Sequence, residues 1–516
     1  MCIVVRHTDY KSDNGEDIEL HGVKQWFRIT KEGPVDQFFA VGGEDEEEQQ
    51  ATGERMPQIV EQILQTGRGI REEDLQQLRG TTAGVDDDNE PAPENVPDNI
   101  ATNNVFDSWG YGGICPRRMS GAVNQNPSLK GLTQNVKPTF EKLFLLLFPF
   151  EFLKDVILTQ TNRRMMDEQE TVVLTIGELL RYIGLWFYMS SMTFDSRRDF
   201  WSSENSTMFE GCPVRLNEWM SRRRFEAITR ALQLTDGNAP TYQDKFWEVR
   251  AILTAWNDNM KDKFTPGWIS CLDESMSKWL NEYTCPGFMC VPRKPWPLGN
   301  EYHTIACGIS GVLYSLELVE GKDEPQQRPR KEFEGLGKTV GLLLRLTRSL
   351  WGTGKAIVLD SGFCVLKGLV ELRKKGVFAA ALIKKRRYWP KYIDGDGIRN
   401  HFQDKPVGSV DVLNGELDTV KVFVHAMKEP DYTMMLMSTY GTTNEMGVEQ
   451  RRILADNSRA TFRYPELVYN HFQYRDAVDS HNSSRMYPLA LEETWKTTRW
   501  PLRVFQFLLA VTEVNC

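Results

Sequence analysis

The spacing of apolar residues changes at Thr265-Pro266-Gly267, and no other feature of the sequence constrains the fold as strongly. Before this turn, apolar residues recur at helical intervals over long segments. These segments are Ile176–Met189, Arg223–Leu234 and Phe246–Met260. After it, the apolar runs are short and bounded by turn residues, which is typical of strands. The sequence therefore predicts a mainly helical domain over residues 140–263 and a sheet-containing domain that begins at residue 264.

The region after the turn alternates between strand-like and helix-like patterns. The five predicted strands are Trp268–Leu272, His303–Ile309, Val312–Val319, Ala356–Leu359 and Val377–Ile383. The second and third are joined by Ser310-Gly311, which suits a tight hairpin. The last two strands each follow a predicted helix, Val340–Leu350 and Val365–Lys375. Three strands in a meander followed by alternating helix and strand indicate a mixed α/β layer, and the RNase H-like fold has this order.

Acidity is concentrated at the beginning of the chain. Residues 1–100 contain 23 acidic and 9 basic residues, a net charge of −14, whereas the remaining residues contain 48 acidic and 53 basic, a net charge of +5. Glu44–Glu48 and Asp86–Glu90, followed by the proline-rich Pro91–Pro97, are too charged to pack into a core. We therefore expect a partly disordered acidic region over residues 1–99, with one short hairpin formed by Trp26–Thr30 and Val35–Val41, and a linker over residues 100–139. The mildly basic remainder is compatible with contacts to phosphate groups.

Several classes of protein are excluded by composition. The most apolar run, Leu143–Leu153, is interrupted by Pro149 and Glu151 and is far shorter than the roughly 20 residues of a membrane-spanning helix, so we expect a buried helix and no membrane association. The first residues lack the apolar stretch of a secretory signal, which indicates an intracellular protein. Nine scattered cysteines suggest reduced thiols, and Cys285 and Cys290 lack the second pair that a zinc site would need.

Acidic residues occur where predicted strands end. Asp273 follows the run Trp268–Leu272, and Asp360 follows Ala356–Leu359. Side chains from distant parts of a chain converge at strand ends in α/β sheets, and two ionised carboxylates at close range repel unless a cation lies between them. Mg²⁺ or Mn²⁺ prefers such oxygen ligands, and two such ions about 3.5–4 Å apart would promote displacement at a phosphodiester. Asp476 and Asp479 are three residues apart and would share one helix face. Considered alone, each of these residues is more often a helix cap or a turn residue.

Basic clusters allow two interpretations each. Arg163-Arg164, Arg197-Arg198 and Arg222-Arg223-Arg224 lie in the predicted helical domain, where they could be solvated helix faces or contacts to DNA phosphates. The cluster Lys384–Arg387 precedes Tyr388 and Trp389, and basic residues beside aromatic ones suit backbone contact with base stacking. A nuclear-import signal or a solvated turn explains that cluster equally well.

Four blocks of sequence, one in the predicted helical domain and three around the acids, resemble piggyBac transposases. GLWFYMSSMTFDSRRDFWSS, WMSRRRFEAITRALQLTD and DKFWEVRAILTAW resemble the family's helical DNA-binding and dimerisation region. FTPGWISCLDESMSKWL, with VPRKPWPLGNEYHTIACG, resembles the first catalytic segment, in which an Asp-Glu pair precedes a proline-flanked lysine and a glycine. GTGKAIVLDSGF and RDAVDSHNSSR, followed by TTRWPLRVF, resemble the second and third catalytic segments. The resemblance covers about residues 140–516, and it rests on the order of the motifs more than on any single one.

The resemblance implies an RNase H-like catalytic core over residues 264–384 and 461–516, interrupted by an insertion domain over residues 385–460. It implies that Asp273, Asp360 and Asp476 are the catalytic, metal-binding triad, with Asp479 an accessory carboxylate and Mg²⁺ or Mn²⁺ the cofactor. Candidates for DNA contact are Arg222, Arg223, Arg224, Lys294, Lys384, Lys385, Arg386 and Arg387. The implied activity is cut-and-paste movement of double-stranded DNA at TTAA targets by a homodimer in the nucleus.

Departures from the family pattern favour an alternative. Ser361 stands where many relatives have Asn, Arg475 where a Gly is common, and Ser480-His481 where a Gln-containing ending is usual. The family's cysteine-rich zinc-binding tail is not found before Cys516, so we expect impaired or differently targeted integration. The alternative is a domesticated or decayed transposase-derived protein that binds DNA without catalysis. A third interpretation makes the acidic first hundred residues a chromatin-interaction or protein-interaction module.

Overall fold

The computed structural model describes residues 125–132, 137–192, 196–202, 216–237, 239–240, 243–292, 294–324, 332–383, 395–454 and 456–516. It also describes three short strands, β1 (Ile29–Thr30), β2 (Gly33–Pro34) and β3 (Phe106–Trp109). β1 and β2 pair antiparallel where the hairpin is predicted. The second strand contains Gly33 and Pro34, which precede the predicted second strand Val35–Val41. Most of the predicted acidic region and linker lies outside the described residues.

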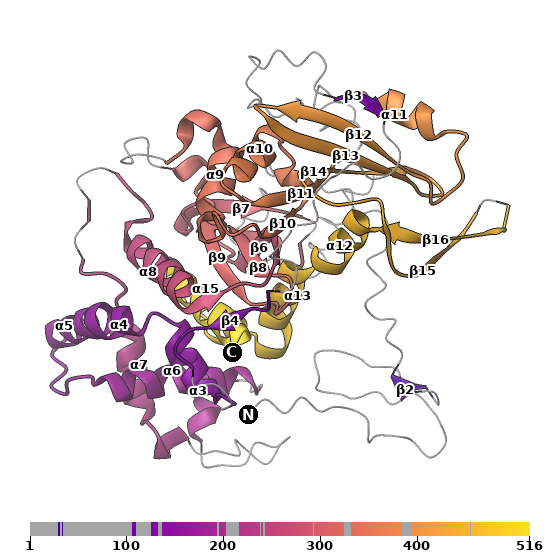
Figure 1. Ribbon diagram of the computed structural model, residues 1–516. Helices are drawn as coiled ribbons and strands as arrows, with labels where there is room; N and C mark the ends of the chain where they lie inside the picture. The colour runs from indigo at the N-terminus through magenta and orange to yellow at the C-terminus, as the bar shows by residue number, and fades with distance from the viewer. Residues whose placement is uncertain are drawn as a thin grey trace.

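All five strands predicted after the turn are present in one mixed sheet (Figure 1). They are β6 (Ile269–Lys278), β8 (Leu298–Cys307), β9 (Leu313–Leu318), β10 (Ala356–Leu359) and β11 (Phe378–Leu382). β6, β8 and β9 form an antiparallel meander, and β10 lies parallel to both β6 and β11. The spatial order is therefore β9-β8-β6-β10-β11, with the short β7 (Phe288–Cys290) also paired to β8.

The same sheet continues beyond β11 into the region predicted as an insertion. β14 (Thr433–Ser438) pairs antiparallel with β11, and β13 (Val420–Lys428) and β12 (Val410–Leu417) extend the sheet to β3. Helix α11 (Gly395–Phe402) precedes these strands. The sheet thus has ten strands, and no break in hydrogen bonding separates residues 410–438 from the strands before them.

The predicted helical domain contains five helices of eight residues or more in its described part. They are α3 (Phe140–Leu147), α5 (Thr159–Asp167), α6 (Ile176–Ser190), α7 (Arg222–Ala231) and α8 (Trp247–Lys263). Thr139, Thr175 and Ser221 cap three of these helices, since each side-chain oxygen accepts a backbone N–H of the first turn. The helix predicted at Leu143–Leu153 is not continuous. Proline lacks the N–H that a helix interior requires, so α3 ends before Pro149, and the short α4 (Phe150–Phe152) and a π-helical turn follow.

The last helix, α15 (Trp500–Asn515), joins the helical domain to the sheet. Phe507 stacks on Tyr302 of β8 with ring centroids 4.0 Å apart, and Phe505 meets Phe148 edge to face at 6.0 Å. The connection before α15 contributes Trp495, which stacks on Trp186 of α6 at 4.5 Å. Aromatic side chains bury large apolar areas, so these contacts hold the two parts of the molecule together.

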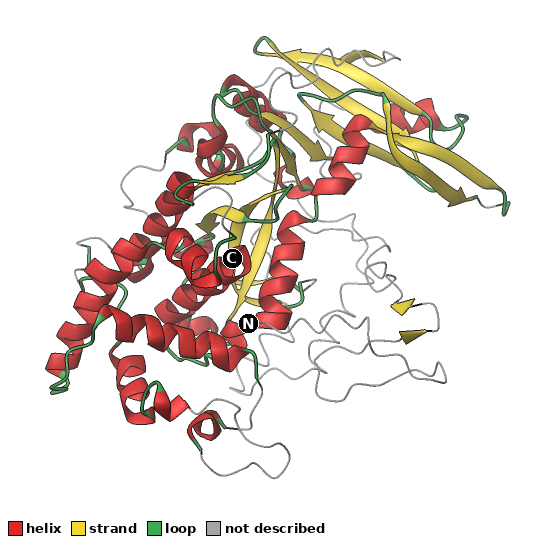
Figure 2. Cartoon of the chain, turned by 60° about the horizontal axis from the view of Figure 1, so that its bottom comes forward, coloured by secondary structure: helices red, strands yellow, loops and turns green. Residues whose placement is uncertain are grey.

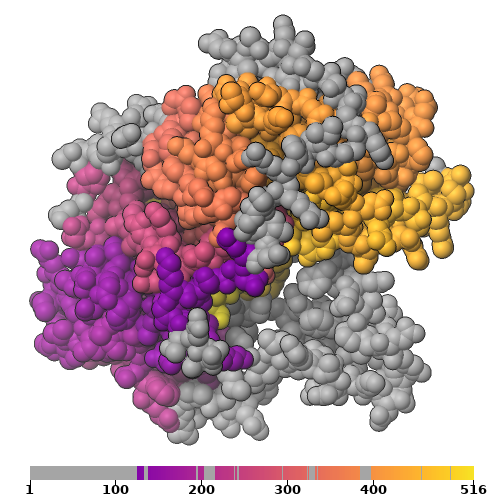
Figure 3. Space-filling model, viewed as in Figure 1, coloured from indigo at the N-terminus to yellow at the C-terminus, as the bar shows by residue number. Residues whose placement is uncertain are grey.

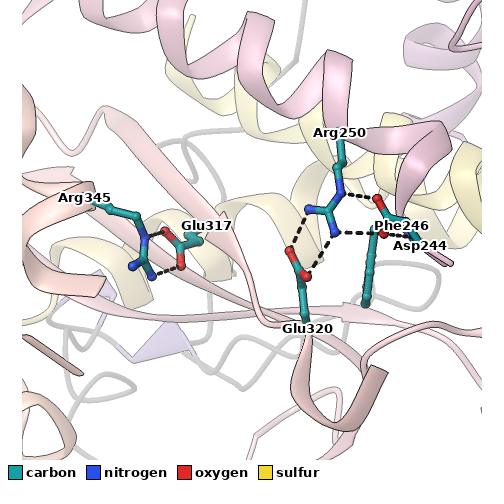
Figure 4. A network of polar contacts seen from close by, with 6 residues as sticks. All are labelled: Asp244, Phe246, Arg250, Glu317, Glu320 and Arg345. Atoms are coloured by element: carbon teal, nitrogen blue, oxygen red, sulfur yellow. Dashed lines mark hydrogen bonds and ion pairs between the residues drawn. The ribbon is translucent and has the colours of Figure 1, made fainter. Parts of the chain in front are cut away.

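Polar contacts also fasten two helices, α8 and α9, to β9 and the residues after it (Figure 4). Arg250 of α8 donates to Asp244 at 2.5 and 2.8 Å and to Glu320, which follows β9, at 2.8 and 3.1 Å. Arg345 of α9 (Lys338–Leu346) makes a second two-pronged contact with Glu317 of β9 at 2.5 and 2.8 Å. Planar guanidinium groups match carboxylates in this geometry, so both pairs fix the orientation of a helix against the sheet.

Helices lie on both sides of the central strands of the sheet (Figure 2). One face packs on a large core that includes residues of α8, α9, α10 (Leu366–Lys374) and α15. The opposite face packs on α12 (Glu466–Tyr474) and α13 (Ala477–Ser484). None of the helices in the described part of the chain combines the length and apolar character that a membrane crossing requires.

Cysteines in the described residues are free thiols, and none of them belongs to a group that could hold a metal there. Cys285 is buried and its thiol lies 3.3 Å from the amide oxygen of Asn300, in agreement with a packing role. The remaining element is a separate two-stranded ribbon formed by β15 (Glu445–Ile453) and β16 (Arg459–Pro465), which leads directly into α12.

Candidate metal centre

Asp273 lies in the middle of β6, and the prediction that it follows the end of a strand is wrong. Strand β6 continues to Lys278 because Asp273 and the residues after it pair with β8. Side chains alternate between the faces of a strand, so Asp273 shares a face with Cys271, which packs against Val478 of α13. Its carboxylate accepts the backbone N–H of Glu274 at 2.7 Å and the residue is 8% exposed. The first predicted acid is therefore buried between the sheet and α13.

Burial raises the pKa of Asp273 to about 8 because the charged form loses its hydration. The nearby Lys294 ammonium opposes this shift, while the negative charges of Asp479 and Glu274 add to it. Asp479 has the largest effect among the carboxylates that act on the pKa of Asp273. A charged Asp273 therefore needs more positive charge than the surrounding protein supplies.

Asp360 lies beside Asp273 at the end of the neighbouring strand. Leu359 of β10 pairs in register with Leu272 of β6, so Asp360 and Asp273 come next on two adjacent parallel strands. Asp360 ends β10 and begins a single 3₁₀ turn, Ser361–Phe363. Burial raises the pKa of the Cys271 thiol, and the charges of Asp273, Asp479 and Asp360 raise it further. The charges of three acids from three separate segments thus act on the same thiol.

Asp476 and Asp479 lie at the beginning of α13, which packs on β6 and β8. The thiol of Cys271 donates to the backbone oxygen of Arg475 at 2.7 Å, and the amide of Asn482 donates to the backbone oxygen of Glu274 at 3.1 Å. These two hydrogen bonds fasten both ends of α13 to strand β6. They place Asp479, in the first turn of the helix, where its charge raises the pKa of Asp273.

Asp476 forms an ion pair with the residue before it, Arg475. The guanidinium of Arg475 lies 3.2 Å from the Asp476 carboxylate, and 62% of the Asp476 side chain is exposed. Partial burial raises the pKa of Asp476, with a further contribution from Asp479, and Arg475 opposes the shift. Solvent screens much of this effect at such exposure. The residue predicted as the third catalytic acid is therefore paired with Arg475, whereas the charge of the predicted accessory acid acts on the buried Asp273.

A second group of possible metal ligands lies on the other face of β6. The ligand atoms of Glu274, Glu301 and His303 all lie within 4.8 Å of one another. Glu274 is directly opposite His303 in the register of β6 and β8, and the His303 ring lies 3.1 Å from the Glu301 carboxylate. Burial lowers the pKa of His303, but the hydrogen bond and charge of Glu301, with the charges of Glu274 and Glu317, leave it raised.

Sequence reasoning missed this second group, although a signal was present. Glu301 and His303 are two residues apart in a strand, which places them on one face. Only the pairing of β6 with β8 adds Glu274 to them. The ammonium of Lys294 lies 3.8 Å from the Glu274 carboxylate, and its charge also lowers the pKa of Asp273. This predicted DNA-contact residue is therefore near both groups of acids.

The other predicted DNA-contact residues lie in two places. Arg222, Arg223 and Arg224 begin α7, where Arg223 is exposed and Arg222 lies 3.8 Å from Glu226. Arg224 donates to Glu178 at 2.7 and 2.9 Å and to a backbone oxygen at 3.0 Å, so it joins α7 to α6. The cluster Lys384, Lys385, Arg386 and Arg387 lies outside the described residues.

A buried ion pair supports the far end of β6. The guanidinium of Arg485 pairs with Glu492 and donates to the backbone oxygen of Met276 at 2.6 Å. Ser277 of β6 donates to the same Glu492 carboxylate. Arg485 is 1% exposed and Glu492 is 3% exposed, so neither charge has water to stabilise it. The pair therefore ties the segment after α13 to the strand that carries Asp273.

Comparison with known proteins places the chain in a family. A family model described as Transposase IS4 matches residues 141–516, about three quarters of the chain. The human PiggyBac transposable element-derived protein 2 is 24% identical over 246 residues, a match that spans 48% of this chain and 40% of the human protein. The chain belongs to the piggyBac family of transposases.

The fold agrees with this membership. A cryo-EM structure of a piggyBac transposase synaptic complex with hairpin DNA matches this chain with a TM-score of 0.56, over 76% of each chain and at 17% identity. Identity at that level shows a shared fold, and the mixed α/β architecture with its large mixed sheet is that fold. Within this piggyBac family chain, the described acids therefore lie in the part that the family model covers.

Proposed function

We propose that the chain is a metal-dependent DNA transposase that cleaves a transposon end and transfers the freed 3′-hydroxyl to target DNA. Membership of the piggyBac family supports a transposase-type enzyme, and the structural neighbour is a transposase in complex with DNA. The observation that carries the proposal is the position of Asp273 and Asp360 on adjacent parallel strands, with Asp479 acting on Asp273 from the helix above them.

The proposal includes an RNase H-like core. Its support is the strand order β9-β8-β6-β10-β11, in which an antiparallel meander is followed by two parallel strands, each preceded by a helix. In this proposal the core comprises residues 264–384 and 461–516, and residues 385–460 are the insertion. Strands β12, β13 and β14 would then be an insertion that lengthens the sheet of its host.

The carboxylates are suited to hold Mg²⁺ or Mn²⁺. The donors near Asp273 are oxygens, which hard divalent cations prefer. The raised pKa of Asp273 shows that its ionised form lacks compensating positive charge, and a divalent cation would supply that charge. Asp273 and Asp360 would be ligands from the sheet, with Asp476 as the predicted third ligand and Asp479 as the accessory acid. The bound ion would activate the attacking oxygen and stabilise the leaving oxygen of a phosphodiester.

Neighbouring side chains would prepare this site. Lys294 favours the ionised form of Asp273, and the backbone N–H of Glu274 holds one of its oxygens in place. Arg475 holds Asp476 at the rim of the site until a stronger positive charge competes for that carboxylate. The hydrogen bonds of Cys271 and Asn482 keep α13 against β6, so the acids stay in position while DNA binds.

Cleavage of cognate DNA tests the proposal. Purified protein is incubated with Mg²⁺ and duplexes that carry the terminal repeats flanking the gene, beside Asp360→Ala and the control Asp258→Ala, an exposed acid of α8. We expect cleavage by the wild type and by Asp258→Ala, and none by Asp360→Ala. If all three bind the duplex and none cleaves it, the protein is a transposase-derived DNA-binding protein without catalysis.

We also propose a homodimer and a nuclear location. Joining two ends of one element requires two active sites, and the target of such an enzyme is chromosomal DNA. Light scattering of the protein with and without end DNA would give twice the chain mass for a dimer. A fluorescent fusion expressed in cells would report the location, and exclusion from the nucleus would contradict that part of the proposal.

A further inference from the structure

The ribbon of β15 and β16 stands apart from the ten-stranded sheet. In Figure 1 it extends to the right of α12, and in Figure 3 it forms an arm at the right edge of the molecule. Its strands pair only with each other in the described structure. An isolated two-stranded ribbon is marginally stable in water, so one of its faces needs support from the rest of the molecule.

The inward face of the ribbon provides this support. Arg452 donates to Glu429 at 2.9 and 3.3 Å and to the hydroxyl of Tyr464 at 2.5 Å. The ring of Tyr464 stacks on Phe472 of α12 at 5.1 Å. Gly408 adopts φ +89°, and a side chain there would come within 2.6 Å of Phe462. The inward side chains therefore anchor the ribbon to the sheet and to α12.

An irregularity shapes the ribbon next to this anchor. The register shifts between Met446 and Gln450, and Gly447 adopts φ +73° close against Tyr469 of α12. A bulge of this kind bends a strand and increases its twist. The part of the ribbon beyond the bulge is consequently directed away from the sheet.

The outward face carries charge that the rest of the protein does not neutralise. Arg451, Arg459 and Arg463 are exposed, and alternation places them opposite to Arg452 and Phe462. Glu449 lies on this face, 3.8 Å from Arg451, and alternation also places the exposed Glu445 here, opposite Pro465. Among the described residues Arg459 and Arg463 form no ion pair. Three guanidinium groups against two carboxylates leave this face positive.

We propose that the outward face of the ribbon is a contact surface for duplex DNA, with Arg451, Arg459 and Arg463 binding phosphates. Charge and shape both support this partner. Guanidinium groups match phosphate oxygens, and the major groove of B-DNA admits a two-stranded ribbon. The exposed Ile453 lies on the same face and offers an apolar contact to a base edge. This inference rests on the proposed function, and it assigns DNA contact to residues outside the basic clusters selected in the sequence.

The ribbon is directly connected in sequence to the helix acids of the candidate metal centre. β16 continues without a loop into α12, and α12 leads through Arg475 to Asp476 and α13. DNA bound along the ribbon is therefore bound by the segment that supplies the helix acids of the candidate metal centre. The ribbon would orient the duplex relative to those acids.

Salt-dependent DNA binding tests the inference. The protein carries Asp360→Ala so that no DNA is cut, and a 30-base-pair duplex of mixed sequence is titrated at several salt concentrations. The test variant is Arg451→Ala/Arg459→Ala/Arg463→Ala. The control variant, Lys154→Ala/Lys261→Ala/Lys421→Ala, removes the same charge from exposed positions elsewhere.

Loss of three phosphate contacts should weaken binding by about 10- to 100-fold near 0.1 M salt and reduce the slope of log K against log salt by about 2–3. The control should change either quantity much less. Glu449→Gln removes one opposing charge and should strengthen binding by about twofold. Unchanged thermal unfolding of the test variant would show that its fold is intact.

Other outcomes would overturn the inference. Equal loss in the test and control variants would mean that only total charge matters. Normal DNA binding with a changed oligomeric state would make the ribbon a contact between protein copies. Failure of the parent protein to bind any duplex would remove both this inference and the proposed function, whereas binding that the ribbon variant retains would remove the inference alone.

Discussion

The candidate metal centre and the β15–β16 ribbon are built in opposite ways. The centre draws on acids separated by 87 residues, from Asp273 to Asp360, and by 116 residues, from Asp360 to Asp476. The ribbon is one continuous segment whose strands pair with each other. Distant segments can crowd like charges in a buried place, while a local segment leaves its charges in water. In the proposed function, catalysis would depend on tertiary assembly and DNA contact on exposed local structure.

The candidate metal centre and the ribbon also differ in the environment of their charged groups. In the centre, burial and neighbouring acids raise the pKa of Asp273, so its ionised form is disfavoured at neutral pH. On the ribbon, the side chains of Arg451, Arg459 and Arg463 are exposed to solvent. A substitution should therefore have a large effect on the chemistry in the first region and a graded effect on affinity in the second.

The largest expected effect is on cleavage. Asp273→Asn should reduce the cleavage rate by at least about 10³-fold, because losing a metal ligand removes several kcal/mol of transition-state stabilisation. Asp456→Asn, in the turn of the ribbon, should leave the rate unchanged. Single-turnover kinetics with Mg²⁺ would measure both. Retention of activity by Asp273→Asn would remove the buried acids from the mechanism.

Asp479→Asn in the same assay distinguishes the two helix acids. Asp476 is the proposed third ligand and Asp479 the accessory acid whose charge raises the pKa of Asp273, so we expect Asp479→Asn to reduce cleavage less than Asp476→Asn does. A larger loss for Asp479→Asn would move the third ligand position to Asp479.

The next effect is on stability. Glu492→Gln leaves Arg485 buried without an opposite charge, and breaking a buried pair in this way costs about 3–5 kcal/mol of unfolding free energy. Glu445→Gln changes an exposed acid of the ribbon and should alter stability by less than about 0.5 kcal/mol. Urea unfolding compares them. Similar losses of unfolding free energy in the two variants would contradict the expected difference between the buried centre and the exposed ribbon.

A pH-dependent effect is expected at Glu513 of α15. Burial raises the pKa of Glu513 from 4.5 to about 8, so its contribution to stability is complete below pH 4.5 and declines as the pH rises to 8. Glu513→Gln should match the wild type near pH 4.5 and be more stable by on the order of 3 kcal/mol at pH 8 and above. Thermal unfolding across this pH range measures the difference. A difference that does not depend on pH would exclude a buried, protonated carboxyl.

The smallest effect is expected at the rim of the centre. An exposed pair such as Arg475 with Asp476 contributes about 0–1 kcal/mol, so Arg475→Ala should increase the cleavage rate by no more than about fivefold. The increase would come from releasing Asp476. A loss greater than tenfold would show instead that Arg475 contacts the DNA.

Local elements followed closely from the sequence. Ile176–Met189 corresponds to α6, Ala356–Leu359 to β10 and Val365–Lys375 to α10, because each has a clear period and a cap or turn residue at its boundary. The predictions were wrong where hydrogen bonding between strands decides how far an element extends. Strand β6 was predicted to end before Asp273, since its second half, ESMSK, is too polar to resemble a buried strand. Hydrogen bonding to β8 on one side overrides that local preference.

The sequence by itself determined the family, the order of helices and strands, and the acids whose positions suggest metal chemistry. The roles of those acids remain predictions. Only the tertiary structure decided that Asp360 lies beside Asp273, that Asp479 acts on the buried acid while Asp476 pairs with Arg475, and that Glu274 joins Glu301 and His303. It also decided which arginines of the ribbon are exposed. The physical reason is that periodicity encodes which face of an element is buried, whereas strand pairing and helix docking determine what that face meets.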